Sequence, residues 1–114
     1  MHIAFLGCGF ITGVHSRHLK ALRDDFVLSY ASRTASKSEA YCRRYFGAGS
    51  YDNYTKAIED PSVDAVVIAV PPRFHLELTL EALSAGKHVL VEKPAYLRIK
   101  DYLEVVAARD RAGR

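Results

Sequence analysis

HIAFLGCGFITG, residues 2–13, decides the fold, because in this stretch an apolar run passes straight into a glycine turn. The run from His2 to Leu6 is short enough for a buried parallel strand, and apolar residues from Val14 to Leu22 return at helical spacing. In parallel sheets, a glycine turn between a strand and a helix is where the phosphates of a dinucleotide bind, at the positive helix end. The stretch therefore predicts an α/β domain with a dinucleotide site.

The two glycines of the turn have different expected roles. Gly7 permits the tight turn, and Gly9 leaves no Cβ between the backbone and a pyrophosphate. The third glycine of the usual pattern falls at Thr12 here, and Gly13 follows one position later. The residues of this turn predicted to contact a cofactor are Gly7, Gly9, Phe10, Ile11 and Thr12. A tight turn without a ligand is the alternative interpretation.

Length and composition predict one folded domain over residues 1–114. Hydrophobic residues make up 49% of the chain and charged residues 25%, which is typical of a folded protein rather than a disordered one. The net charge of +3 is small, and the 16 basic residues are spread among 13 acidic ones. Nucleic-acid binding is therefore the minority interpretation.

Cys8 and Cys42 have no metal-ligand spacing, so no metal site is predicted, and a single pair of cysteines is poor evidence for a disulfide framework. A small filler residue without chemistry is the expected role of Cys8. We expect no exported leader and no membrane span, since no apolar stretch approaches ~20 residues. These features favour a cytoplasmic location.

Short apolar runs alternate with helical patterns along the whole chain. The expected strands are Ile3 to Leu6, Val27 to Ala31, a weak one near Ser50 and Tyr51, Ala65 to Val70, and His88 to Val91. The expected helices are Gly13 to Leu22, Ser36 to Phe46, Tyr54 to Ile58, Phe74 to Ser84, and Ile99 to Ala112, and the expected helix stops are Gly47, Gly86 and Gly113. The alternation predicts a Rossmann-type, doubly wound parallel sheet in the order 3-2-1-4-5.

The end of the second strand carries no carboxylate where one is expected to bind the adenosine ribose, roughly 20 residues after the glycine turn. The residues there are Ser32, Arg33 and Thr34, with Lys37 a turn further on. A hydroxyl, a guanidinium and an ammonium suit a 2′-phosphate, so the sequence favours NADP over NAD. In the alternative interpretation, Arg33 is an ordinary solvated side chain.

Two further segments follow the carboxyl ends of predicted strands. Their residues predicted to contact the cofactor are Val70, Pro71, Pro72 and His75, and Glu92, Lys93 and Pro94. Val70, Pro71 and Pro72 form a rigid exit after the fourth strand, followed by His75 in the first turn of the next helix. His75 has two interpretations left open: it faces the nicotinamide side of the crevice, or it bonds nearby backbone. His15, just beyond the glycines, is expected to be structural.

The fifth strand ends in Glu92, Lys93 and Pro94. A lysine at the carboxyl edge can hydrogen-bond a substrate hydroxyl or carbonyl and take part in proton transfer, so Lys93 is the candidate catalytic residue. Its alternative is a surface lysine whose stem covers apolar groups.

These segments together resemble the N-terminal half of the Gfo/Idh/MocA oxidoreductases. The resemblance rests on GCGFI at residues 7–11 with His15, AVPP at 69–72 with His75, and AGKHV at 85–89 leading into EKP at 92–94. It implies hydride transfer between a nicotinamide cofactor and a sugar, cyclitol or related carbonyl compound. It also implies that Lys93 touches both substrate and cofactor, with Glu92 and Pro94 beside it. Thr12 replaces the family's usual small residue and puts the packing of the helix on the strand in doubt.

The family's second domain, which carries the substrate pocket, has no counterpart in these residues. We therefore expect this piece to bind NADP(H) with little or no turnover. A non-enzymatic NADP(H) sensor or scaffold is the alternative from another class, and an adenine-nucleotide-binding domain without hydride chemistry is a third. The fifth strand leaves an unpaired sheet edge, which predicts a homo-oligomer.

Overall fold

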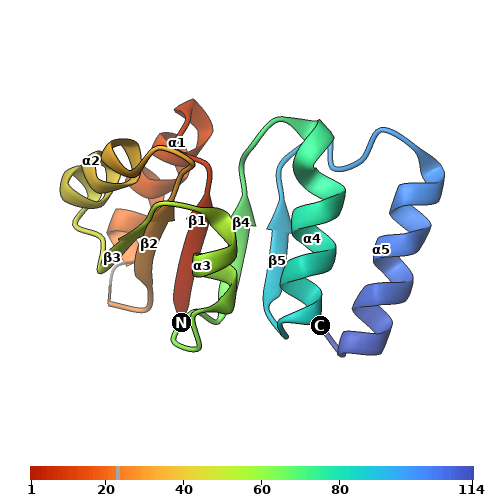
Figure 1. The fold of residues 1–114 in the computed structure, drawn as a ribbon. Coiled ribbons are helices and arrows are strands. Elements are labelled where there is room, and N and C mark those ends of the chain that lie inside the picture. Colours follow the sequence, from red (N-terminus) through yellow and green to blue (C-terminus); the bar gives the residue numbers. More distant parts are fainter. Residues whose placement is uncertain (23) are drawn as a thin grey trace.

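The computed structural model describes residues 1–22 and 24–114. Within these residues, five parallel strands form one sheet in the order β3-β2-β1-β4-β5 (Figure 1). The strands are β1 (His2–Leu6), β2 (Val27–Ala31), β3 (Gly49–Tyr51), β4 (Ala65–Ile68) and β5 (His88–Val91). This order confirms the predicted fold class, and it places the central switch point between β1 and β4.

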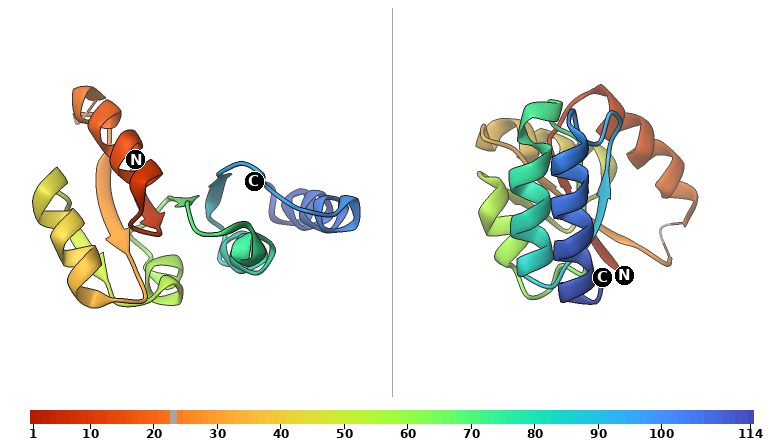
Figure 2. Two further views of the ribbon diagram at one scale, coloured as in Figure 1. Left: turned by 90° about the horizontal axis from the view of Figure 1, so that it is seen from above. Right: turned by 90° about the vertical axis from the view of Figure 1, so that its right-hand side faces the viewer.

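Helices follow the strands in alternation. They are α1 (Phe10–Leu19), α2 (Ala35–Tyr45), α3 (Tyr54–Glu59), α4 (His75–Ser84) and α5 (Ile99–Ala112), with short 3₁₀ turns at Lys20–Leu22 and Pro72–Phe74. Figure 2 shows α5 beside α4, outside the sheet edge that β5 forms. In the part of the chain that the structure describes, no helix is long and apolar enough to span a bilayer.

Strand periodicity divides the core between the two faces of the sheet. Ala4 and Leu6 of β1 pack with Val66 and Ile68 of β4 on the face covered by α3 and α4. Because successive residues of a strand point to opposite faces, the other β1 residues, Ile3 and Phe5, join the cluster under α1 and α2. Both faces of the central strands are thus buried, which explains their nearly continuous apolar sequence.

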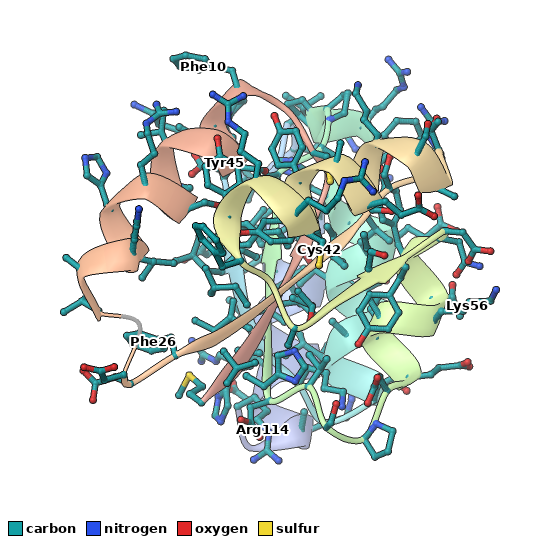
Figure 3. All side chains as sticks on the ribbon, turned by 90° about the vertical axis from the view of Figure 1, so that its left-hand side faces the viewer. Phe10, Phe26, Cys42, Tyr45, Lys56 and Arg114 are labelled. Atoms are coloured by element: carbon teal, nitrogen blue, oxygen red, sulfur yellow. The ribbon has the colours of Figure 1, made fainter. Side chains whose placement is uncertain are left out.

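An aromatic layer fills the space under α1 and α2. The Tyr30 ring stacks on Phe5 with 5.7 Å between ring centroids, and its hydroxyl donates to Ser16 Oγ at 3.0 Å. Burial raises the pKa of Tyr30 to about 12, so its phenol stays neutral and keeps this donor. Figure 3 shows Tyr45 between α1 and α2. A Cβ on Gly13 would lie 2.9 Å from the Tyr45 hydroxyl oxygen, so the glycine after Thr12 permits close helix packing.

Two predicted boundaries at the carboxyl edge are wrong in the same direction. The first helix begins at Phe10 rather than Gly13, because the chain turns into the helix directly after Gly9 and Gly13 N already donates to Gly9 O. β4 ends at Ile68 rather than Val70, where the chain approaches Pro71, which has no N–H to donate. The first change shortens the connection between β1 and α1, and the second lengthens the connection between β4 and α4.

The left-handed C-cap of α2 is Phe46, at φ +56°, and not the predicted Gly47. Gly47 is required for a different reason, since a Cβ there would lie 2.9 Å from the Tyr30 ring. At the other two predicted stops the expectation is correct: Gly86 and Gly113 both have positive φ, at +73° and +65°.

Lys87 of the AGKHV segment is a structural lysine. Its side chain is buried, and Nζ donates to the carbonyl oxygens of Asp60 at 2.8 Å and Val63 at 2.7 Å. The ammonium thus satisfies carbonyls in the loop between α3 and β4, at the sheet edge opposite the glycine turn.

Candidate functional site

The glycine turn has a backbone that only glycine can supply at its first position. Gly7 has φ +110°, and a Cβ there would lie 2.4 Å from the carbonyl oxygen of Ala69. Its amide donates to Ala31 O at 3.0 Å, and the preceding Leu6 carbonyl accepts from the Ala69 amide at 2.9 Å, so the turn is anchored to the ends of β2 and β4. The close approach of β1 and β4 at this point therefore depends on Gly7.

Gly9 is open where Gly7 is crowded. It has extended backbone at φ −111° and ψ −170°, and a Cβ built on it meets no atom within 4 Å. As the N-cap of α1 it offers no side chain to the first turn, which also contains no acidic residue. The amides of that turn lack intrahelical acceptors, so the positive end of α1 is available to an anion.

Two side chains, one from α1 and one from α2, hydrogen-bond the backbone of the glycine turn at this helix start. Thr12 is fully buried, and its hydroxyl donates to the Gly7 carbonyl at 2.6 Å. Tyr41 of α2 donates from its hydroxyl to the Gly9 carbonyl at 2.9 Å. Thr12 therefore strengthens the packing of helix on strand, contrary to the expected weakness, while Phe10 is 83% exposed and Ile11 half-buried beside it.

The segment after β2 lies beside a small pocket. Ser32 is buried, and its Oγ accepts from the Thr34 amide at 3.1 Å. The Arg33 guanidinium lies 5.5 Å from the centroid of the Phe74 ring, which comes from the turn after β4. The lining residues of this pocket, about 220 Å³ in volume, are Arg33, Tyr54, Thr55, Phe74, Glu77, Leu78 and Glu81. At this distance the guanidinium and the ring are in direct cation–π contact, so a flat aromatic group can stack on the outer face of the guanidinium.

The exit from β4 is held by His75. Its ring is buried at 1% exposure, with Nε2 2.8 Å from Val70 O and Nδ1 2.9 Å from Ala95 O. Both ring nitrogens therefore face backbone carbonyls, which supports the backbone-partner interpretation. Pro71 is exposed and Pro72 half-buried on the same loop.

The exit from β5 is held from the side of α1. Glu92 Oε1 lies 2.5 Å from His15 Nε2, and Glu92 Oε2 accepts from the Lys93 amide at 3.3 Å. The His15 hydrogen bond is the main cause that holds the pKa of Glu92 below its ordinary value, so the carboxylate is ionised at neutral pH. The side chains of Lys93 and Pro94 are exposed.

The predicted residues gather at one edge of the sheet. Figure 1 shows the turns after β1, β4 and β5 together at its upper edge, as the carboxyl ends of parallel strands require. Thr34 and Lys37, at the start of α2, are exposed. Tyr41 and Phe74 join the site although the sequence pattern did not single them out, because their partners come from distant segments. Within residues 1–22 and 24–114, no cluster of His, Cys, Asp or Glu could hold a metal ion.

Cys8 lies within the turn but is buried, and its Sγ lies 3.6 Å from Ala31 O. Burial raises the pKa of Cys8 to about 11, opposed by the nearby charge of Lys37. We expect iodoacetamide at pH 8 to alkylate the half-buried Cys42 and to spare Cys8, because the thiolate is the reactive form. Mass spectrometry counts the adducts, with urea-unfolded protein as the control that takes two. Rapid double alkylation of the folded chain would contradict the buried position.

Comparisons with known proteins all match this chain to oxidoreductases. Residues 1–114 match the GFO_IDH_MocA family, described as "Oxidoreductase family, NAD-binding Rossmann fold". The 1,5-anhydro-D-fructose reductase of Ensifer adhaerens is 38% identical over 87 residues, which are 76% of this chain and 26% of the reductase.

Solved structures show the same fold with either cofactor. KijD10, a 3-ketoreductase from Actinomadura kijaniata in complex with NADP and TDP-benzene, superposes with a TM-score of 0.92 at 28% identity, over 99% of this chain and 35% of that chain. The WlbA dehydrogenase from Bordetella pertussis, in complex with NADH and UDP-GlcNAcA, gives a TM-score of 0.89 at 26% identity, over 98% and 34%. The chain thus spans about a third of the length of these solved structures.

Proposed function

Because the chain belongs to the Gfo/Idh/MocA oxidoreductase family, we propose that it binds NADP(H) in preference to NAD(H) across the carboxyl edge of its sheet. The observation that carries the proposal is the start of α1, where an uncapped helix end lies beside open space at Gly9. The pyrophosphate fits there, against the first-turn amides of Phe10 and Ile11.

The pocket beside Arg33 supplies the adenosine end of the proposed site. The adenine ring is proposed to stack on the outer face of the Arg33 guanidinium, whose other face lies against the Phe74 ring at 5.5 Å. Ser32, Thr34 and Lys37 surround the place where a ribose 2′-phosphate would lie, and no carboxylate stands among residues 31–37 to repel it. The charge of this segment is what favours NADP(H) over NAD(H).

Exchanging the charge at position 33 tests this specificity. We expect Arg33→Asp to weaken NADPH binding by about 100-fold, since a guanidinium contact is lost and a repulsive carboxylate gained. NADH binding should change much less, because a carboxylate can accept from the free ribose hydroxyls, so the preference should reverse. Isothermal titration calorimetry with both cofactors measures this.

Arg43→Asp is the matched control for that exchange. Arg43 is exposed on α2, and its side chain pairs with Glu39 rather than facing the Phe74 pocket. If Arg33→Asp and Arg43→Asp lower NADPH affinity equally, the effect of Arg33 is only one of overall charge. That result would show that Arg33 does not contact the 2′-phosphate.

The nicotinamide end is proposed to lie between the exits of β4 and β5, beside Pro71, Pro72 and Lys93. A bound nicotinamide supplies or accepts the hydride that passes to or from a carbon of the substrate. The exposed Lys93 ammonium would hydrogen-bond the substrate oxygen and exchange a proton with it as that carbon is reduced or oxidised. We propose a sugar, cyclitol or related carbonyl compound as substrate, because the matched relatives include a sugar reductase.

We further propose that residues 1–114 alone turn substrate over slowly or not at all. Lys93 is exposed, and both ring nitrogens of His75 are occupied by backbone carbonyls. A lone lysine at an open edge neither encloses a substrate nor excludes water from it. In the longer relatives, we expect the substrate-binding half to lie in the part of the sequence that this chain does not match.

We also propose that the protein works in the reducing cytoplasm, and the free thiols of Cys8 and Cys42 support this location.

The β5 edge is the proposed self-association surface. Leu90 of β5 is 52% exposed, and exposed apolar side chains continue at Leu97, Ile99, Tyr102 and Leu103. Since an unpaired strand edge beside apolar groups favours pairing with another strand, we expect a concentration-dependent dimer in sedimentation velocity experiments. Leu90→Lys should shift it toward monomer, whereas Val27→Lys, at a similarly exposed position on an interior strand, should not. A monomer at every concentration would refute this surface.

A further inference from the structure

We propose that His15 is a positioning residue for the segment that carries Lys93, and that it acts through the carboxylate of Glu92. The inference rests on the proposed function, because it assigns His15 to the nicotinamide end of that site. His15 belongs to α1, which starts at the glycine turn, whereas Glu92 follows β5. The bond between them joins the phosphate end of the site to the end where the hydride would move.

His15 is fixed on its own side of the bond. Its ring is stacked against Phe5 of β1, with 6.2 Å between centroids and 26° between planes. This contact directs Nε2 toward Glu92 Oε1, 2.5 Å away and 77 residues further along the chain. In the sheet, β4 lies between β1 and β5, so the bond reaches past one strand. Of the His15–Glu92 pair, the Glu92 side chain is the more buried, at 19% exposure against 36%.

Glu92 in turn fixes the position of the Lys93 backbone. Its amide donates to Ile68 O at 3.0 Å, which continues the β4–β5 ladder by one residue. Its second carboxylate oxygen accepts from the Lys93 amide, so one oxygen serves His15 and the other serves Lys93. The lowered pKa of Glu92 keeps both acceptors charged at neutral pH.

The other flank of Lys93 is held independently. Ala95 O is 2.9 Å from His75 Nδ1, and the same buried ring contacts Val70 O on the β4 exit. Lys93 and Pro94 therefore lie between Glu92 and Ala95, which are each bonded to a histidine. The two histidines come from helices on opposite faces of the sheet. The lysine side chain stays exposed while its backbone is fixed, which limits where Nζ can reach.

Ligand binding separates this role from a general structural one. We expect His15→Ala to weaken NADPH binding about tenfold, in proportion to the loss of a hydrogen bond to a charged group. Binding of adenosine 2′,5′-bisphosphate, which lacks the nicotinamide end, should stay within about twofold, because the adenosine contacts do not involve His15. His15→Gln keeps a donor and should recover part of the loss. His18→Ala, on the exposed face of the same helix, is the control and should change neither ligand.

The Lys93 amide gives a second readout that needs no cofactor. In ¹H–¹⁵N spectra, loss of the carboxylate acceptor in Glu92→Ala should move the Lys93 amide proton upfield, and His15→Ala should move it in the same direction. An unmoved Lys93 amide in His15→Ala overturns the inference, as does an equal loss of affinity for NADPH and the bisphosphate. If the unsubstituted protein binds neither NADPH nor NADH, the proposed function fails, and the Lys93 amide still decides whether His15 positions this segment.

Discussion

Gly7→Ala is expected to lower the free energy of unfolding by about 3 to 5 kcal/mol, the range of severe single substitutions. Two costs combine at this position. Alanine is strained at φ +110°, and its Cβ would lie 2.4 Å from the Ala69 carbonyl oxygen, which belongs to backbone that cannot turn aside. Relief requires β1 and β4 to separate at the edge where the site is built. Urea denaturation followed by circular dichroism measures the effect.

Gly49→Ala provides the matched control for Gly7→Ala. It also adds one methyl group to a glycine, here in β3, but its Cβ would lie 3.5 Å from Ser29 Oγ, an ordinary contact. We expect its unfolding free energy to stay within about 1 kcal/mol of the parent, the usual cost or gain of such a change. If Gly7→Ala unfolds at the same urea concentration as Gly49→Ala, the turn is not closed as described.

Gly9→Ala is expected to have the opposite profile, with normal stability and poor cofactor binding. The backbone at Gly9 is extended, and no atom beyond its two neighbouring residues lies within 4 Å of the added methyl. That open space is where the pyrophosphate is proposed to approach the helix. Losing one or two charge-assisted hydrogen bonds of about 1.5 to 3 kcal/mol each gives roughly 100-fold weaker NADPH binding.

Thermal unfolding and calorimetric titration of the same Gly9→Ala sample test both halves of this expectation. Unchanged stability together with unchanged NADPH affinity would show that the phosphates do not bind at this helix start. A large loss of stability would show instead that Gly9 is needed by the fold. The contrast between Gly7 and Gly9 thus separates a glycine required by the protein from one required by its ligand.

The sheet order followed from the sequence because short apolar runs alternate with helical patterns and a glycine turn follows the first of them. Because the strands are parallel, the sheet order alone predicted that the segments after β1, β2, β4 and β5 lie at the carboxyl ends of the strands. Side-chain partners did not, because they come from far along the chain, as with His15 and Glu92 or Arg33 and Phe74. Thr12 shows the same limit: a departure from the glycine pattern gave no sign that its hydroxyl would bond the turn itself.

Element boundaries failed where local preference was overruled by tertiary contact. Phe46 adopts a left-handed conformation that its side chain disfavours, because Gly47 must lie against the Tyr30 ring.

The preference for one cofactor depends on individual side chains rather than on the fold. KijD10 with NADP and WlbA with NADH share this fold almost equally, so the fold does not select the cofactor. Residues after β2, with Arg33 foremost, are where we place that selection.

Calorimetric titration of the unsubstituted chain with NADPH and, in parallel, NADH is the most direct test of the central claim. We predict saturable binding of NADPH at one site per chain, at least about tenfold tighter than NADH, a difference of 1.4 kcal/mol. Tighter binding of NADH would contradict the role given to Ser32 and Arg33. Absence of binding by both cofactors would contradict the account as a whole.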